Sequence, residues 1–129
     1  MIMSPFALYL RELRLNRGYK QKELAHLLGY EPSYISALER SKKGPPKRDF
    51  VDRLIRGLQL SNDEQIALAQ DLKQSRRQIL IPLDASEREY ALLHHLESQL
   101  GQLNSTQIQL IELALQITVI RDHPAQLSV

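Results

Sequence analysis

Apolar residues recur every three or four positions through the first 75 residues, the spacing of helices that each turn one face towards a core. This pattern predicts five helices, at about 5–16, 21–28, 32–40, 48–58 and 62–75. The first helix draws its apolar surface from Phe6, Leu8, Leu10, Leu13 and Leu15, and the residues expected to face inward on the fourth are Phe50, Val51, Leu54, Ile55 and Leu58. We expect these helices to form a first domain at residues 1–77.

Residues that favour helix ends lie between these segments. Ser4 and Pro5 suit an N-cap and a first helical position. Ser61 with Glu64 three residues later has the pattern of a capping box, which opens the fifth helix. Residues 41–47 contain the run Gly-Pro-Pro, which cannot continue a helix, so a loop is expected there.

The pattern changes after residue 77, where a second segment at 78–129 begins. Residues 78–83 form a short, partly β-branched apolar run that contains a proline and is too short for a helix. We expect this run to be extended. In one interpretation it is an isolated strand, which would need the same strand of a second subunit as its partner.

Two further helices are expected in this second segment. Ser86 and Glu89 have the spacing of a capping box, and the helix that they open is expected to continue to Leu100. Asn104 or the serine after it caps a last helix, which is expected to reach about Ile120. The tail from residue 121 onwards, with a proline at 124, is expected to be frayed.

The last predicted helix is apolar around most of its circumference, and a helix of that kind must be buried on more than one side. A segment of about 50 residues has too little mass to bury it alone. It is therefore expected to pack against the first domain, a second subunit or both, and we favour a homodimer. The interface residues expected from the extended run and this helix are Ile79, Ile81, Leu83, Ile108, Ile111 and Leu115.

Charge is divided unevenly between the two parts. The whole chain carries a formal net charge of +2. Residues 1–80 hold 15 Lys and Arg against nine Asp and Glu, a net +6, whereas residues 81–129 hold two against six, a net −4. A basic part beside an acidic part is typical of a DNA-binding domain joined to a partner-binding segment, although a chance asymmetry of a solvated surface would look the same.

The window from residue 21 to residue 40 has the pattern of two helices that cross through a tight turn. Ala25 is small where the backbones approach, and Gly29 enters the left-handed backbone region without a Cβ penalty. The positions that carry the pattern are Gln21, Leu24, Ala25, Gly29, Ile35, Ser36, Leu38 and Glu39. Their spacing resembles that of the phage repressor/Cro-like (XRE-type) family of helix-turn-helix transcriptional regulators, over roughly residues 6–75. The resemblance implies an all-α fold with a five-helix, repressor-like DNA-binding domain.

The resemblance also implies site residues. In this family the residue that matches Gln21 meets a phosphate and braces the recognition helix, and the residues that match Arg14 and Glu39 form a structural pair. The helix at 32–40 would enter the major groove of double-stranded DNA. The residues expected at its tip and on its outward face are Pro32, Ser33, Tyr34, Ser36, Ala37 and Arg40, and the residues expected on the phosphate backbone are Lys42, Lys43, Lys47 and Arg48.

The base-facing chemistry of this helix is weak. Arg to guanine and Gln or Asn to adenine are the strong direct contacts, and none of these side chains occupies the base-facing positions of Ser33, Tyr34 and Ala37. Recognition is therefore expected to depend in part on DNA shape and on the loop. Tyr34 has an alternative role, in which it packs on Arg40 or on the sugar backbone.

Catalysis has little support in the sequence. The chain has no cysteine, and adjacent residues such as His94 and His95 point about 100° apart on a helix. We expect no enzyme activity, no metal and no cofactor. No run of about 18 apolar residues occurs, so we expect a cytoplasmic protein.

The sequence therefore predicts a sequence-specific transcriptional regulator, more often a repressor in the family that it resembles, which acts as a homodimer. Two alternatives stay open. One is an antitoxin or phage-type regulator that binds a protein partner through its C-terminal helices. The other is a protein-interaction module that has kept the fold and lost DNA binding.

Overall fold

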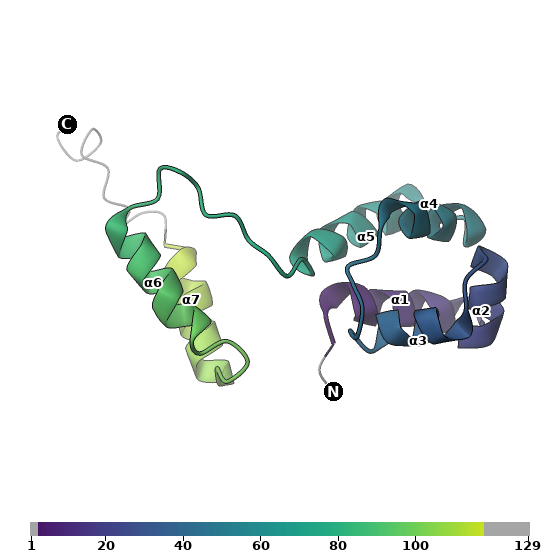
Figure 1. Cartoon of the computed structure of the whole chain (residues 1–129), viewed down its shortest axis with the longest axis horizontal. Helices are drawn as coiled ribbons and strands as arrows, with labels where there is room; N and C mark the ends of the chain where they lie inside the picture. The colour runs from purple at the N-terminus through teal and green to yellow at the C-terminus, as the bar shows by residue number, and fades with distance from the viewer. Residues whose placement is uncertain (1–2, 118–129) are drawn as a thin grey trace. The chain divides into compact units, whose positions relative to one another are not determined.

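The computed structural model describes residues 3–117 and is all-α over that range, with no strand, as the sequence predicts. Its helices are α1 (Pro5–Asn16), α2 (Gln21–Leu28), α3 (Pro32–Glu39), α4 (Arg48–Gly57), α5 (Asn62–Gln74), α6 (Glu87–Glu97) and α7 (Ser105–Leu115) (Figure 1). The chain divides into two compact units, residues 1–80 and 81–129. The expected frayed tail after residue 120 lies outside the described residues.

The first five helices match the predicted ranges to within one residue at each end. Helix α1 begins where expected because the Ser4 Oγ accepts a hydrogen bond from the Ala7 N–H at 3.1 Å. The capping box of α5 is also present: the Glu64 N–H donates to Ser61 Oγ at 3.2 Å and the Ser61 N–H donates to Glu64 Oε1 at 3.0 Å. Local capping chemistry therefore sets these boundaries.

The core of the first unit takes one stripe from each helix. Its largest fully buried side chains are Phe6, Phe50, Leu10, Leu24, Ile35, Leu38, Leu54 and Leu68. Leu8 and Leu15 contribute apolar surface to α1 outside this core, since they are 47% and 54% exposed. With 3.6 residues per turn both lie on the side of α1 opposite to Leu10, and Ala7 and Arg14 take the inner positions.

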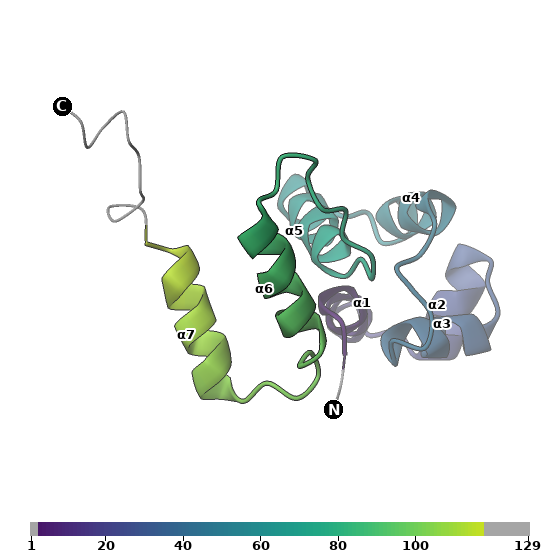
Figure 2. The ribbon, with the colours of Figure 1, turned by 60° about the vertical axis from the view of Figure 1, so that its left-hand side comes forward.

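Helix α1 packs against α3 and α5, and α2 packs against α3 and α4 (Figure 2). The approach of α4 to α2 is especially close at Gly57. A Cβ added there would lie 2.6 Å from Leu28 Cδ2, which is nearer than two carbon atoms tolerate. The lack of a side chain at this position therefore lets α4 support the end of α2.

Residues 78–82 have no regular secondary structure. Ile79 and Leu80 are 74% and 93% exposed, and Leu83 is fully exposed. The run therefore forms no strand within the described residues. A strand is stable only when a neighbouring strand forms hydrogen bonds with it. Its pairing with a second subunit stays a prediction.

Helices α6 and α7 begin at their expected capping boxes and end earlier than predicted. Each N-cap side chain, Ser86 Oγ or Asn104 Oδ1, accepts from the backbone N–H three residues later. Helix α6 stops at Glu97 rather than Leu100, because the Ser98 Oγ donates to the His95 carbonyl at 2.7 Å and the following backbone bonds tighten the turn.

Helix α7 ends at Leu115, not near residue 120. The four residues 117–120 are all β-branched, and such residues lose side-chain freedom in a helix. The part of the expected helix at 118–120 lies outside the described residues. This run of low helix propensity accounts for the early end.

No residue of α6 or α7 is buried, so the second unit does not bury the apolar surface of its last helix by itself. A groove of about 280 Å³ separates the two helices. It is lined by Leu92, His95, Leu96, Gln99, Leu103, Gln107, Leu110 and Ile111. None of the helices in residues 3–117 combines the length and apolar content needed to cross a membrane.

Candidate nucleic-acid interface

The turn between α2 and α3 is built around Gly29. Its backbone has φ +80°, in the left-handed region, and the next residue, Tyr30, donates its N–H to the Ala25 carbonyl at 2.9 Å. A Cβ at Gly29 would lie 3.0 Å from the Nη1 of Arg53 on α4. The turn therefore needs glycine for its backbone angle, and a side chain there would also make the Arg53 guanidinium shift by a few tenths of an ångström.

Three side chains join α1, α2 and the end of α3. Arg14 donates to Glu39 twice, from Nε to Oε2 at 2.7 Å and from Nη2 to Oε1 at 3.0 Å. The Gln21 Nε2 donates to the same Oε1 at 3.1 Å, and Arg14 Nη1 donates to the Tyr19 carbonyl at 2.9 Å. Glu39 is almost fully buried. This network fixes α3 on the helices behind it, and it places Gln21 at the start of α2 with its amide directed to α3.

The outward side of α3 carries small and polar residues. Ile35 and Leu38 are buried in the core, so the opposite side of the helix faces solvent. Pro32 and Ser33 are exposed at its N-terminal end, and Ser36 and Ala37 are half-buried. The exposed Arg40 directs its Nε back to the Ser36 carbonyl at 3.3 Å. The two residues at the tip of α3 are therefore its most accessible groups.

Tyr34 lies in an aromatic cluster with Tyr30 and Phe50. Its ring stacks on Tyr30 with centroids 5.1 Å apart and meets the edge of Phe50 at 5.6 Å. Burial raises the pKa of the Tyr34 hydroxyl, which stays protonated at neutral pH. Lys43 Nζ lies 5.8 Å from the ring centroid. Part of this ring is therefore structural, and the Tyr34 hydroxyl makes no hydrogen bond within the described chain.

A second cluster, which the sequence analysis missed, braces the turn from α4. Tyr30 donates its hydroxyl to Asp49 Oδ2 at 3.0 Å, and Arg53 Nη1 donates to the Leu28 carbonyl at 3.1 Å. The Arg53 guanidinium also lies 5.2 Å from the Tyr30 ring centroid. The one signal in the sequence was the i, i+4 spacing of Asp49 and Arg53, which form an ion pair at 3.4 Å.

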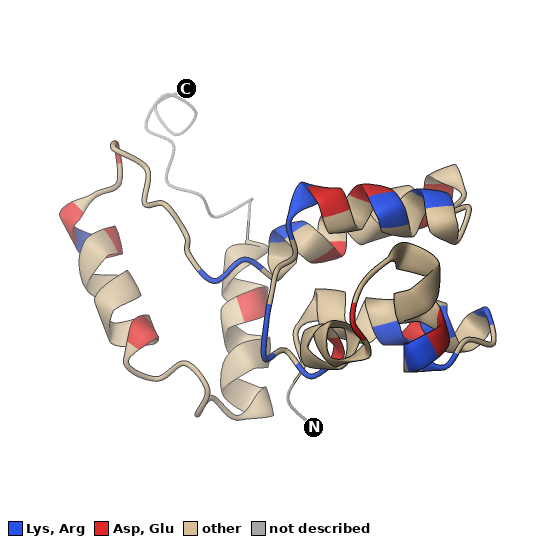
Figure 3. Cartoon of the chain, turned by 45° about the vertical axis from the view of Figure 1, so that its right-hand side comes forward, with Lys and Arg blue, Asp and Glu red and all other residues tan. Residues whose placement is uncertain are grey.

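The segment after α3 carries exposed basic residues. Its four cations are Lys42, Lys43, Lys47 and Arg48, here called the basic loop. Ser41 has φ +58°, and the Lys42 N–H bonds to the Ala37 carbonyl at 2.9 Å, which closes α3 in the manner of a Schellman motif. The ion pairs among residues 3–117 involve Arg14, Arg17 and Arg53, not the basic loop. None of its four cations is therefore in an ion pair within the described residues; Figure 3 colours Lys and Arg blue and Asp and Glu red along the chain.

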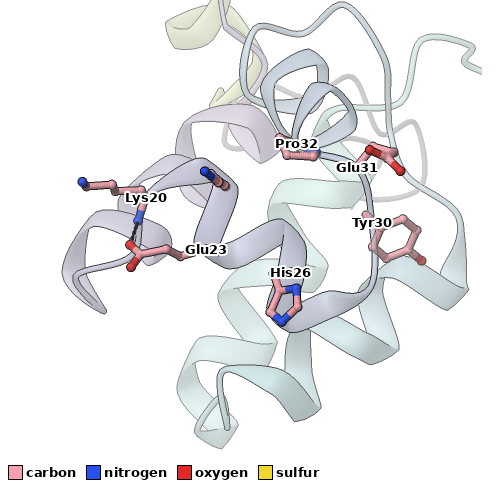
Figure 4. Close-up of a pocket in the computed structure, with 7 residues that line it drawn as sticks. Lys20, Glu23, His26, Tyr30, Glu31 and Pro32 are labelled. Atoms are coloured by element: carbon pink, nitrogen blue, oxygen red, sulfur yellow. Dashed lines mark hydrogen bonds between the residues drawn. The ribbon is translucent and has the colours of Figure 1, made fainter.

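A hollow of about 750 Å³ lies on the outer side of α2, next to the turn (Figure 4). It is lined by Lys20, Lys22, Glu23, His26, Tyr30, Glu31 and Pro32. The Glu23 carboxylate accepts from the Lys20 N–H at 2.7 Å and so caps α2. Charges of both signs surround this hollow. Within residues 3–117, no group of three His, Asp or Glu side chains is placed to hold a metal ion.

Comparison with known protein families identifies a helix-turn-helix domain in the chain. The helix-turn-helix domain family matches residues 5–77, which is more than half of the chain and includes all of α1 to α5. Neither the curated proteins nor the solved structures contain a match to the chain.

Proposed function

Because the chain belongs to the helix-turn-helix domain family, whose type is a DNA-binding regulator, we propose that it is a sequence-specific transcriptional repressor. In this proposal α3 enters the major groove of double-stranded DNA. The observation that carries this proposal is that α3 is held in place and is followed by exposed positive charge. The buried Arg14–Glu39 contact holds α3, and the basic loop, whose cations form no ion pair in the described chain, follows directly after it.

The tip and outward side of α3 would make the base contacts. Ser33 is exposed and its hydroxyl donates or accepts, while Ala37 suits a thymine methyl group. Tyr34 is half-buried, and its hydroxyl makes no hydrogen bond within the described chain, so it would be free to bond to a base. These groups discriminate less than Arg or Asn would, so the proposal includes readout of DNA shape through the backbone contacts of the basic loop.

We assign the second unit to dimerisation, with a second copy of the α6–α7 hairpin as the occupant of its groove. A helix of 11 residues is only marginally stable on its own and depends on packing against other elements. Helices α6 and α7 have 11 residues each and no buried residue, so this packing is missing within one chain. Five of the eight side chains that line the groove are Leu or Ile, and none is Asp, Glu, Lys or Arg. A second apolar hairpin complements such a surface without burying a charge. The contributions of Ile108 and Leu115, and of Ile79, Ile81 and Leu83 in the linker, are part of the same proposal.

A dimer also fits the geometry of DNA. Helix-turn-helix dimers place their recognition helices in successive major grooves, about 34–36 Å apart. Two half-sites roughly double the number of contacts, which would offset the weak base-reading chemistry of each α3. Occupation of a promoter by such a dimer would block transcription.

A gel-shift titration tests this function. The full chain is mixed with the DNA fragment upstream of its own gene in the presence of excess unrelated DNA, and its mass is measured by sedimentation equilibrium. We expect a discrete shifted band and a mass of twice the 14.9 kDa of one chain. The control variant Ser33→Arg places a bulky cation at the tip of α3 and should change the fragment preference without changing the mass.

The other outcomes would separate the alternatives. A monomer that binds DNA would remove the two-half-site arrangement. A monomer that dimerises only with a protein encoded by a neighbouring gene would favour the antitoxin-like regulator. Absence of a shift even at low salt would favour a protein-interaction module.

A further inference from the structure

Two exposed arginines, Arg76 and Arg77, follow α5 directly and lie outside the helix-turn-helix motif. Neither forms an ion pair within residues 3–117. They belong to the first compact unit, at the start of the segment that leads out of it. Neither arginine belongs to the core or to the Arg14–Glu39–Gln21 contacts that hold α3. A role for them therefore depends on the groups that lie near them.

Two serine hydroxyls fix those surroundings. Ser75 Oγ accepts from the Phe6 N–H at 2.8 Å, and it also donates to the Asp71 carbonyl at 2.6 Å, which closes the end of α5. Ser41 Oγ accepts from the Ser4 N–H at 2.8 Å. Both chain segments are thereby attached to the first turn of α1, at backbone nitrogens only two residues apart.

The separation of these two attachment points is short. Two residues of chain span at most about 7 Å, so the two serine hydroxyls lie within about 13 Å of each other. Each serine directly precedes a pair of cations, Lys42–Lys43 in one segment and Arg76–Arg77 in the other. The two basic pairs therefore follow attachment points on the same end of the first unit.

We infer that Arg76 and Arg77 form a second phosphate-binding segment, which extends the backbone contact of the basic loop. This inference rests on the proposed DNA-binding function. A DNA strand offers one phosphate per 3.4 Å of helix axis, so cations carried by two such neighbouring segments reach separate phosphates of the same duplex. Arginine suits this role because its planar guanidinium binds a phosphate through two parallel hydrogen bonds.

The salt dependence of DNA binding tests the inference. The affinity of the full chain for a fluorescent 30-base-pair duplex of mixed sequence is measured by anisotropy between 50 and 200 mM salt. Each phosphate contact contributes about 0.9 to the slope of log affinity against log salt. The R76Q/R77Q variant is therefore expected to lower the slope by about 1.8, as K42Q/K43Q should.

A matched control removes the same charge elsewhere. Arg11 on α1 and Arg56 on α4 are exposed, and neither is in an ion pair within the described part of the chain. The R11Q/R56Q variant should keep the slope of the wild type. If R76Q/R77Q also keeps it while the wild type binds, the inference is overturned and the proposed function stands. If the wild type shows no binding at 50 mM salt, both are overturned.

Discussion

Arg14 and Glu39 meet in a bidentate contact between α1 and the last residue of α3, with donor–acceptor distances of 2.7 and 3.0 Å. Glu39 also accepts from Gln21, so one buried carboxylate receives donors from two other helices. Two charges taken out of water attract strongly only when their remaining hydrogen-bonding groups are satisfied. No buried side-chain nitrogen or oxygen lacks a partner within residues 3–117, so this condition is met.

Removal of one partner should therefore be far more damaging than removal of both. We expect Arg14→Met and Glu39→Leu each to lower the free energy of unfolding by about 3–5 kcal/mol, since each leaves an uncompensated buried charge. The R14M/E39L double variant should lose less than either single variant. Urea unfolding measures all three variants. Losses below about 0.5 kcal/mol in the single variants would show that the pair contributes no more to stability than an ordinary surface contact.

The turn glycine allows a second stability test with a close control. Gly29→Ala and Gly18→Ala both place a side chain at positive φ, which costs about 1–2 kcal/mol. Nothing lies within 4 Å of a Cβ at Gly18, whereas at Gly29 it would displace the Arg53 Nη1 that bonds to Leu28. We expect Gly29→Ala to cost at least about 1 kcal/mol more in urea unfolding. Equal losses would mean that Arg53 does not support the turn.

The ion pair between Arg17 and Glu64 gives a pH dependence. The hydrogen bond from Arg17, together with the Ser61 backbone N–H, lowers the pKa of Glu64 from 4.5 to about 2. A carboxylate with a lowered folded-state pKa stabilises the fold above pH 4.5, and this contribution is lost as the pH falls from 4.5 to 2. The difference in unfolding free energy between the wild type and Glu64→Gln should be constant above about pH 5 and shrink towards pH 2.

A control for this pH series is Glu12→Gln. Glu12 is exposed and has no ion pair or side-chain hydrogen bond in the described chain. Its replacement removes the same charge and should have a small effect throughout. A Glu64→Gln difference that stayed constant down to pH 2 would show that the pair does not stabilise the fold.

Sequence pattern was sufficient for the helices of the first unit because their ends depend on local chemistry. Ser4, Ser61 and Gly29 act through neighbours only a few residues away, so their effect is legible in the sequence. The family resemblance also predicted that Arg14 and Glu39 form a pair, and the structure places them in contact.

Contacts that join distant segments were not predicted. The bonds from Ser41 and Ser75 to the start of α1 span 37 and 69 residues, and nothing in a periodic pattern signals them. The contact of Tyr34 with the edge of the Phe50 ring on α4 is of the same kind. The early ends of α6 and α7 were not predicted, because neither helix has a buried residue that would hold its last turn.

The proposed dimer predicts that side chains in the groove between α6 and α7 determine whether the protein sediments as two chains or as one. Leu96→Glu and Ile111→Glu each place a charge in the groove between α6 and α7, and we expect each to shift the sedimentation mass from two chains to one. Ile66→Glu alters an isoleucine of the first unit that is 65% exposed, and it should leave the mass unchanged. A dimer that persists in both groove variants would place the interface elsewhere.

Selection of binding sites from a pool of randomised duplexes tests the central claim most directly. The full chain should enrich one sequence with two related halves centred about one helical turn apart, 10–10.5 base pairs. Tyr34→Phe, which keeps the aromatic packing and removes only the hydroxyl, should relax the preference at one position in each half. Recovery of an unenriched pool at 50 mM salt would contradict the account of α3 as a helix that reads DNA sequence.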